Sequence, residues 1–135
     1  MSKVTGLGMA VAVDDSGGTP QTISGDVNDV QFGTPRGLQT ITGLDKSGVE
    51  RLLLLADGHV TLKGTFNADA GKSHAVFGSV TTCGVARTCR VTLPGGAYMA
   101  MELLFSTYTI VRGPDGSLTW TATGDLADGT VPTWA

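Results

Sequence analysis

Two β-rich segments on either side of a Gly-Pro-Asp-Gly turn are the feature that most restricts how this chain folds. Pro114 fixes the backbone torsion at the second position of the turn, and Gly116 is free to adopt positive φ. The segment after the turn alternates between hydroxyl side chains and apolar ones, the apolar positions being Leu118, Trp120 and Ala122. The pattern predicts a β-hairpin over 97–112 and 116–124, with one apolar face and one threonine-rich face.

The first strand of this hairpin carries large side chains on both faces. Alternation places Met99, Met101, Leu103 and Phe105 on one face, and Leu104 between polar residues on the other. We therefore expect one face to pack in the core and the other to meet a neighbouring subunit. The residues predicted at a subunit interface are Met99, Met101, Leu104, Phe105, Tyr108, Trp120, Val131 and Trp134.

The C-terminal end is apolar, whereas chain ends are usually polar and frayed. Val131 and Trp134 allow two interpretations. The tail docks on its own domain, or it docks across an interface, where tryptophan is a favoured anchor.

Most of the remaining chain is typical of strands joined by short turns. Extended segments are expected at 8–14, 21–33, 38–42, 58–66 and 87–93, with a bulge or turn at Gly25 and Asp26. Residues 14–20 and 34–37 are expected to be a loop and a break. A short helix is predicted over 67–77, which Gly78 would end.

Residues 45–56 are ambiguous. Asp45 can cap a helix, whereas four consecutive leucines are also typical of a buried strand. We favour one or two helical turns. The fold expected for residues 1–135 is a single, mainly β domain: a small antiparallel β-sandwich or partly open barrel with one short flanking helix.

The composition argues for assembly rather than for binding nucleic acid through phosphates. Charged residues make up 16% of the chain, against about 25% in typical soluble domains. Nine basic and twelve acidic residues give a pI near 5.1, without the basic excess that phosphate binding needs. A small domain with so little charge has a large core or is covered by neighbouring subunits.

No motif predicts catalysis, a cofactor or a metal site. The sequence Gly71-Lys72-Ser73 lacks the earlier glycine of a phosphate-binding loop, because residue 66 is phenylalanine. Two cysteines and two distant histidines do not have the spacing of zinc ligands. Cys83 and Cys89 are either two reduced thiols or a disulfide. We expect the protein not to be an enzyme.

The start of the chain lacks the apolar stretch of a signal peptide, and the longest apolar runs, 9–13 and 52–56, are too short to span a bilayer. We therefore expect no membrane partner, and a protein made in the cytoplasm and kept there until it is assembled or released.

Three blocks of the chain carry a family resemblance. They are the start at Val4-Thr-Gly-Leu-Gly8, residues 40–64, and the pattern Glu-Leu-Leu-Phe-x-x-Tyr-x-x-x-Arg before Asp115-Gly-Ser-Leu-Thr-Trp120. Together they resemble tail tube (major tail) proteins of long-tailed phages of actinobacteria. The resemblance implies the tail-tube fold and hexameric rings stacked into a hollow tube that conducts DNA to the host.

The resemblance also implies how such subunits meet. Each would lend strands to a continuous inner barrel with a weakly acidic lumen, and loops at 14–20, 34–48 and 67–74 would connect rings. The residues predicted in these ring-stacking loops are Asp14, Asp15, Arg36, Asp45, Lys46 and Lys72. Other tail proteins, such as the tape measure and the terminator, are the further partners that it implies.

Two other functions fit the same composition. A head decoration protein that stabilises the capsid lattice also has low charge and a β-rich fold, and would lie on the capsid surface. A small β-barrel enzyme or ligand-binding module would need a converging polar pocket, which the sequence does not indicate.

Overall fold

The computed structural model describes residues 5–80, 84–130 and 132–135. The described strands are β1 (Ala10–Asp14), β2 (Pro20–Thr22), β3 (Val27–Gly33), β4 (Arg36–Thr40), β5 (Arg51–Ala56), β6 (His59–Thr65), β7 (Arg87–Thr92), β8 (Tyr98–Arg112) and β9 (Leu118–Leu126). A 3-10 turn, η1 (Ser24–Asp26), and one short helix, α1 (Ser73–Phe77), accompany them. The expected mainly β, antiparallel fold with one short helix is confirmed.

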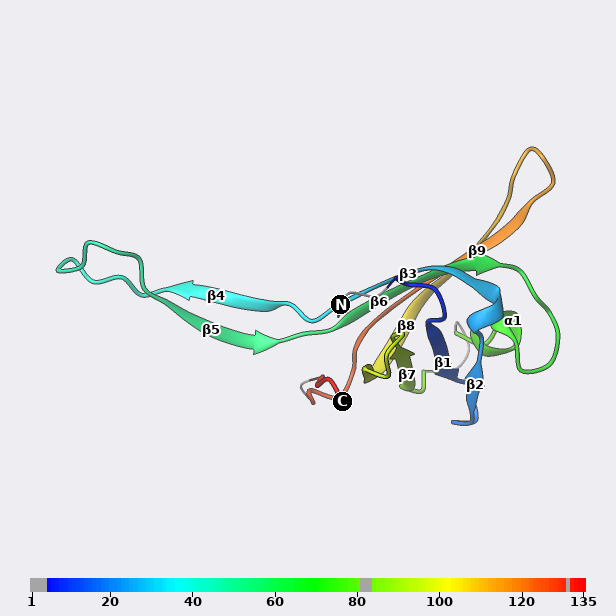
Figure 1. Ribbon diagram of the computed structural model, residues 1–135, viewed down its shortest axis with the longest axis horizontal. Helices are drawn as coiled ribbons and strands as arrows, with labels where there is room; N and C mark the ends of the chain where they lie inside the picture. The colour runs from blue at the N-terminus through cyan, green and yellow to red at the C-terminus, as the bar shows by residue number, and fades with distance from the viewer. Residues whose placement is uncertain (1–4, 81–83, 131) are drawn as a thin grey trace.

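Seven strands form one antiparallel sheet in the order β2-β1-β7-β8-β9-β6-β3 (Figure 1). In a flat sheet the two edge strands would lie about 29 Å apart. Residues 23–26 alone connect β2 to β3, and such a connection spans at most about 18 Å. The sheet must therefore curl, and it forms a partly open barrel around a single core.

The core is filled from the inner face of this curled sheet. Trp120 and Leu62 are almost fully buried, and Phe77 of α1 packs 5.2 Å from the Trp120 ring. The Trp120 indole N–H donates to the carbonyl of Thr65 at 2.9 Å, so its polar atom is satisfied. The alternation predicted for β8 and β9 is confirmed over 99–105 and 118–124, and a register shift between Phe105 and Thr107 then changes which β8 residues face inward.

Helix α1 is shorter than the predicted helix over 67–77. Gly71 adopts φ +73°, a left-handed conformation that interrupts a helix, and the Asn67 side chain accepts the Asp69 N–H in a local turn. The helix starts at Ser73, whose N–H donates to the Asp26 carboxylate at 3.1 Å. The buried Arg87 guanidinium donates to the Val76 carbonyl and holds the other end.

The helical turns favoured within residues 45–56 are wrong. Arg51–Ala56 is strand β5, which pairs with β4 in a separate two-stranded sheet. This hairpin, with its connecting residues 41–50, projects far from the curled sheet (Figure 1) and is called the arm below. It continues the β3–β6 pair, because Gly33 lies opposite His59 and the Asp57 N–H donates to the Pro35 carbonyl.

The C-terminal tail lies on its own domain. Ala135 exchanges two backbone hydrogen bonds with Tyr98, and the Trp134 ring lies 5.7 Å from that of Phe32. Trp134 nevertheless stays 51% exposed. Cys89 is buried and forms no disulfide with a described residue. Cys83 and Val131 fall outside the described residues, so the predicted alternatives for the cysteine pair stay open.

Candidate assembly surfaces

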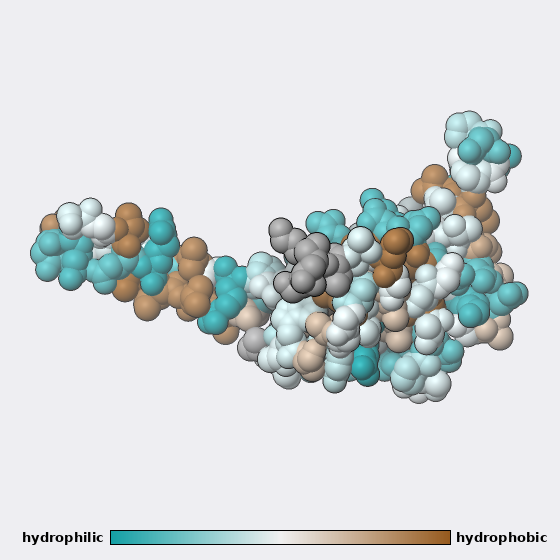
Figure 2. All heavy atoms as spheres, viewed as in Figure 1, coloured by the Kyte–Doolittle hydropathy of each residue, from teal (hydrophilic) through white to brown (hydrophobic). Residues whose placement is uncertain are grey.

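The arm exposes leucines that no other part of the described chain covers. Leu38 of β4 lies opposite Leu53 of β5, and Leu55 follows Leu53 across a register shift in the pair. These three side chains, called the leucine strip, are 58%, 60% and 91% exposed. Figure 2 shows the hydrophobic colour along the arm. Exposed apolar patches of this kind mark sites of protein association.

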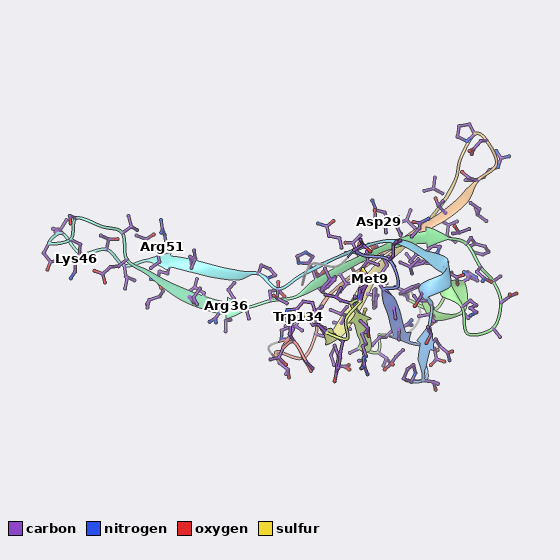
Figure 3. All side chains as sticks on the ribbon, viewed as in Figure 1. Met9, Asp29, Arg36, Lys46, Arg51 and Trp134 are labelled. Carbon is purple, nitrogen blue, oxygen red and sulfur yellow. The ribbon has the colours of Figure 1, made fainter. Side chains whose placement is uncertain are left out.

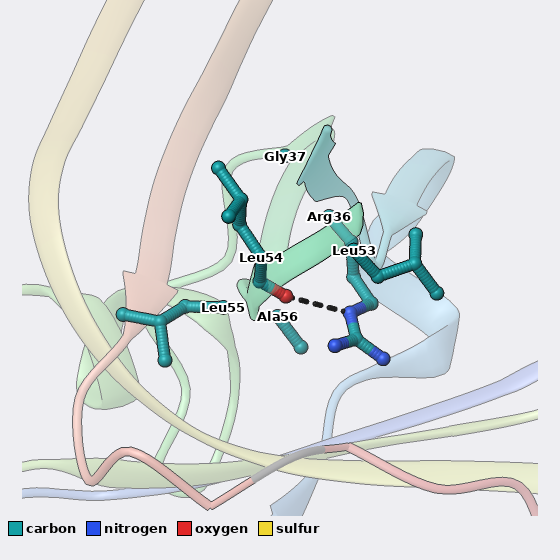
Figure 4. A pocket seen from close by; sticks show the side chains of 6 residues that line it. All are labelled: Arg36, Gly37, Leu53, Leu54, Leu55 and Ala56. Carbon is teal, nitrogen blue, oxygen red and sulfur yellow. Dashed lines mark hydrogen bonds between the residues drawn. The ribbon is translucent and has the colours of Figure 1, made fainter. Parts of the chain in front are cut away.

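The opposite face of the arm is also apolar. Leu52 and Leu54 are 51% and 44% exposed. Near its base the Arg36 Nε donates to the Leu54 carbonyl at 2.9 Å, as Figure 4 shows. The Leu54 side chain packs against Gly37, and a Cβ atom at position 37 would lie only 3.3 Å from it. The result is a shallow apolar hollow beside a guanidinium group, lined by Arg36, Gly37 and residues 53–56.

The tip of the arm is tied by polar contacts. The Glu50 N–H donates to the Thr42 hydroxyl at 2.9 Å, and the Lys46 ammonium lies 3.7 Å from the Glu50 carboxylate. From residue 36 to 56 the arm has three basic and two acidic side chains, which leaves six basic and ten acidic for the rest of the chain. The arm is therefore slightly basic on an acidic protein.

A second feature is an open edge on β8. Strand β7 pairs with β8 only as far as Leu103, whereas β9 pairs with it from there to Arg112. Within the described residues, the stretch 104–112 therefore has no strand on its other side. Strand β3 is the opposite edge of the same sheet. The half-sheet β8-β9-β6-β3 thus has two open edges, which are templates for pairing with another chain.

The outer face of this half-sheet is a polar lattice. The register aligns two rows of side chains across the four strands: Asp29, Lys63, Thr121 and Thr109 in one, and Gln31, Thr61, Thr123 and Thr107 in the next. In the first row an acid and a base face each other, and in a third row Asp125 lies opposite His59. With neutral histidine, these rows carry a net charge of about −1 per subunit.

A third feature is the far end of the β8–β9 hairpin. Ile110, Val111 and Leu118 are 43%, 53% and 39% exposed there. Figure 1 shows this hairpin projecting from the body at the end opposite the arm. In Figure 2 its tip is hydrophilic and its base hydrophobic. Sequence reasoning did not select these three residues, although they lie next to the predicted turn.

The residues predicted at a subunit interface do not lie on one surface. Met99, Met101, Phe105 and Trp120 are only 2%, 3%, 8% and 1% exposed. Their side chains fill the core of their own subunit, and they have almost no surface left for a neighbour. We correct the prediction accordingly, because at these four positions the inward face of β8 and β9 is the core face.

The other predicted interface residues keep some exposure. Leu104 is 45% exposed on the outer face of β8. Tyr108 is half-buried, with its hydroxyl 3.1 Å from the His74 Nδ1, and burial raises its pKa. The Trp134 ring lies beside that of Phe32. Figure 3 labels Trp134 at the side of the body from which the arm projects.

The residues predicted in ring-stacking loops fall into separate groups. Arg36 and Lys46 lie at the base and tip of the arm (Figure 3), and Asp45 is next to Lys46. Asp14 ends β1 and Asp15 follows it; the Asp15 carboxylate accepts the Gly17 and Thr19 N–H groups. The Thr19 hydrogen bond is the main reason why the pKa of Asp15 is lowered. Lys72 lies before α1, and its neighbour Gly71 lies close to Gln21, whose amide donates to the Asp15 carboxylate.

Among residues 5–80, 84–130 and 132–135, no group of three or more His, Cys, Asp or Glu side chains is placed to hold a metal. No described helix is long and apolar enough to cross a membrane.

Comparison with known proteins gives a structural likeness. No protein-family model matches the chain, and no curated protein matches it. A chain from the tail of an empty gene transfer agent (GTA) particle, solved with C6 symmetry, superimposes with a TM-score of 0.79 at 14% identity, covering 98% of this chain and 99% of that one. A chain from the virion of a native GTA particle gives 0.77 at 13%, with the same coverage. The protein therefore has the fold of a chain found in a six-fold symmetric, phage-like tail.

Proposed function

We propose that this protein is the subunit of a tail tube in a phage-like particle, assembled as hexameric rings that stack into a hollow tube. The observation that carries the proposal is the likeness over 98% of the chain to a chain in a C6-symmetric tail. The sequence resemblance adds a finer proposal, namely that the particle is a long-tailed phage of actinobacteria.

Ring closure would use the two open edges of the half-sheet. In the proposed ring, residues 104–112 of β8 pair with β3 of the next subunit, so that backbone groups left open in the subunit are satisfied. Six subunits with four strands each give a barrel of 24 strands. At about 4.8 Å per strand, its backbone diameter is at least about 37 Å, and strand tilt widens it.

The outer face of the half-sheet would line the channel, because α1 and the core occupy the inner face. Threonine hydroxyls dominate this lining, and the Asp29–Lys63 pair neutralises itself. The remaining charge of about −1 per subunit weakly repels phosphates. DNA would therefore pass without adhering to the wall.

Stacking would use the arm. Its leucines are exposed in the subunit, and burying one such side chain contributes about 1.5–3 kcal/mol. Arg36, Asp45 and Lys46 are part of the arm and would contact the neighbouring ring. Asp14, Asp15 and Lys72 are part of the body. In this proposal the protein has a structural role without catalysis or a cofactor.

The same proposal sets the location and the other partners. The subunit would assemble in the host cytoplasm and reside in the virion tail. The ends of the tube would meet a terminator, and its lumen would hold a tape measure protein during assembly.

Negative-stain electron microscopy of the purified protein tests the proposal. We expect rings and hollow tubes with a regular repeat as concentration rises. A protein that stays monomeric or trimeric at all salt and protein concentrations, but binds expanded capsids, would instead be a head decoration protein.

A further inference from the structure

The apolar inner face of the β8–β9 hairpin extends beyond the core that it packs. Trp120, which lies opposite Ile110, is 1% exposed. Two residues before it on the same face, Leu118 is 39% exposed, and Ile110 is 43% exposed. The Phe66 N–H donates to the Leu118 carbonyl, so the half-buried Phe66 lies at the foot of this surface. We call Ile110 and Leu118 the hairpin ledge.

We propose that the leucine strip of one subunit docks on the hairpin ledge of a second copy of this chain. The inference rests on the proposed tube, and it names the surface that receives the arm. Outside the arm, the exposed large apolar side chains of the described residues are otherwise scattered: Leu7, Val85, Leu104 and Trp134. Ile110, Val111 and Leu118 are the three exposed apolar side chains that lie together on one hairpin.

The position of the two surfaces favours contact between copies. Figure 1 shows the arm and the β8–β9 hairpin at opposite ends of the long axis, so the strip of a subunit does not reach its own ledge. A contact between two different patches is heterologous, and when it does not close into a ring it repeats indefinitely. Stacked rings need this kind of contact.

The charge distribution also favours a second copy of this chain as the partner of the arm. The arm has one more basic than acidic side chain, whereas the rest of the chain has four more acidic than basic ones. Arg112, which lies opposite Leu118, and Asp115 in the turn carry opposite charges, so the attraction acts between the basic arm of one copy and the acidic body of another as a whole. Arg51 lies on the strip's face of β5, two residues before Leu53, and supplies one of these charges.

The test uses reciprocal variants of the full chain. The arm variant carries Leu53→Asp and Leu55→Asp, and the hairpin variant carries Ile110→Asp and Leu118→Asp. The control, Val85→Asp, places one carboxylate at a 49% exposed valine that belongs to neither the strip nor the ledge. Each preparation is examined by negative-stain microscopy and by sedimentation, alone and as an equal mixture of the two variants.

We expect each double variant alone to stop at single rings, with the sedimenting tube fraction reduced at least tenfold. The mixture should give paired rings, because intact arms of the hairpin variant meet intact ledges of the arm variant. The control should form tubes like the wild type. Melting curves of the variants show whether the body has kept its fold, and Ile110→Ser with Leu118→Ser serves if the aspartates unfold it.

Two results would overturn the docking assignment: tubes formed by a folded hairpin variant at the wild-type concentration, or a mixture that yields no paired rings although each variant forms rings. Failure of the tube itself looks different. A wild-type chain that forms neither rings nor tubes contradicts the proposed function together with the docking.

Discussion

The body and the arm use the same kind of residue in opposite ways. In the body, apolar side chains point inward from a curled sheet and are almost fully buried, as Val60, Leu62 and Trp120 show. In the two strands of the arm, leucines occur on both faces and are 44% to 91% exposed. An isolated two-stranded hairpin is marginally stable in water. This difference is the basis of our proposal that the body folds alone and that another chain covers the arm.

The largest contrast is expected in thiol reactivity. Burial raises the pKa of the Cys89 thiol to about 12, so almost no thiolate is present at pH 8. In a Cys83→Ser chain, iodoacetamide should modify Cys89 at least about 10³-fold more slowly than a cysteine placed on the arm by Leu55→Cys. Mass spectrometry of timed samples measures both rates. Equal rates would show that the body opens as freely as the arm.

Core truncation should separate the two regions next. Trp120→Ala removes a buried ring and its hydrogen bond to Thr65, and it should cost about 3–5 kcal/mol of unfolding free energy. Leu55→Ala, at a 91% exposed position, should change the stability of the monomer by less than about 0.5 kcal/mol. Urea unfolding at low concentration measures both. A large effect at Leu55 would mean that the arm packs within its own subunit.

Two glycine-to-alanine substitutions, one in the body and one in the arm, compare how tightly the backbone is packed in the two regions. At Gly64 a Cβ would lie 1.7 Å from the Asp26 carbonyl oxygen, so Gly64→Ala forces β6 and η1 apart. Overpacking of this kind costs about 1–3 kcal/mol or more. At Gly48, near the arm tip, nothing lies within 4 Å of the added Cβ. Gly48→Ala should therefore leave the melting temperature unchanged, and equal losses at both sites would be inconsistent with this structure.

The smallest effect is expected at the arm's ion pair. Lys46 and Glu50 are 3.7 Å apart with side chains about half exposed, and such pairs contribute about 0.2–1 kcal/mol. Glu50→Gln should lower monomer stability by no more than this amount, and added salt should remove the difference. A cost that persists in high salt would argue that the arm tip is buried against its own body.

Sequence reasoning recovered the body better than the arm. The turn at 113–116 and the alternation after it correctly predicted the β8–β9 hairpin. Turn residues and two-residue alternation are local signals that can be read from the sequence. Curling of the sheet was expected only as a fold class, since strand order depends on distant pairings. At 45–56 the possible Asp45 cap led us to favour helical turns, whereas the four consecutive leucines belong to strand β5, which is exposed and not buried.

The candidate site was harder to predict for a related reason. Large side chains such as Met101 and Phe105 were placed at the interface, although a single chain uses its largest side chains first for its own core. Ile110 and Leu118 were missed because the pattern that buries Trp120 continues through them. Their exposure becomes visible only in the structure, where the core ends at Trp120 and both side chains lie beyond it.

Replacing the arm is the most direct test of the claim that the body folds alone and the arm serves assembly. Residues 36–56 would be exchanged for Asn-Gly, a two-residue hairpin turn, because Pro35 and Asp57 are already hydrogen-bonded. Melting temperature and negative-stain microscopy would be measured together with the full chain. The account predicts an unchanged melting temperature at a concentration where both are monomeric, and no tubes at any concentration. An armless protein that still forms tubes, or that no longer folds, would contradict it.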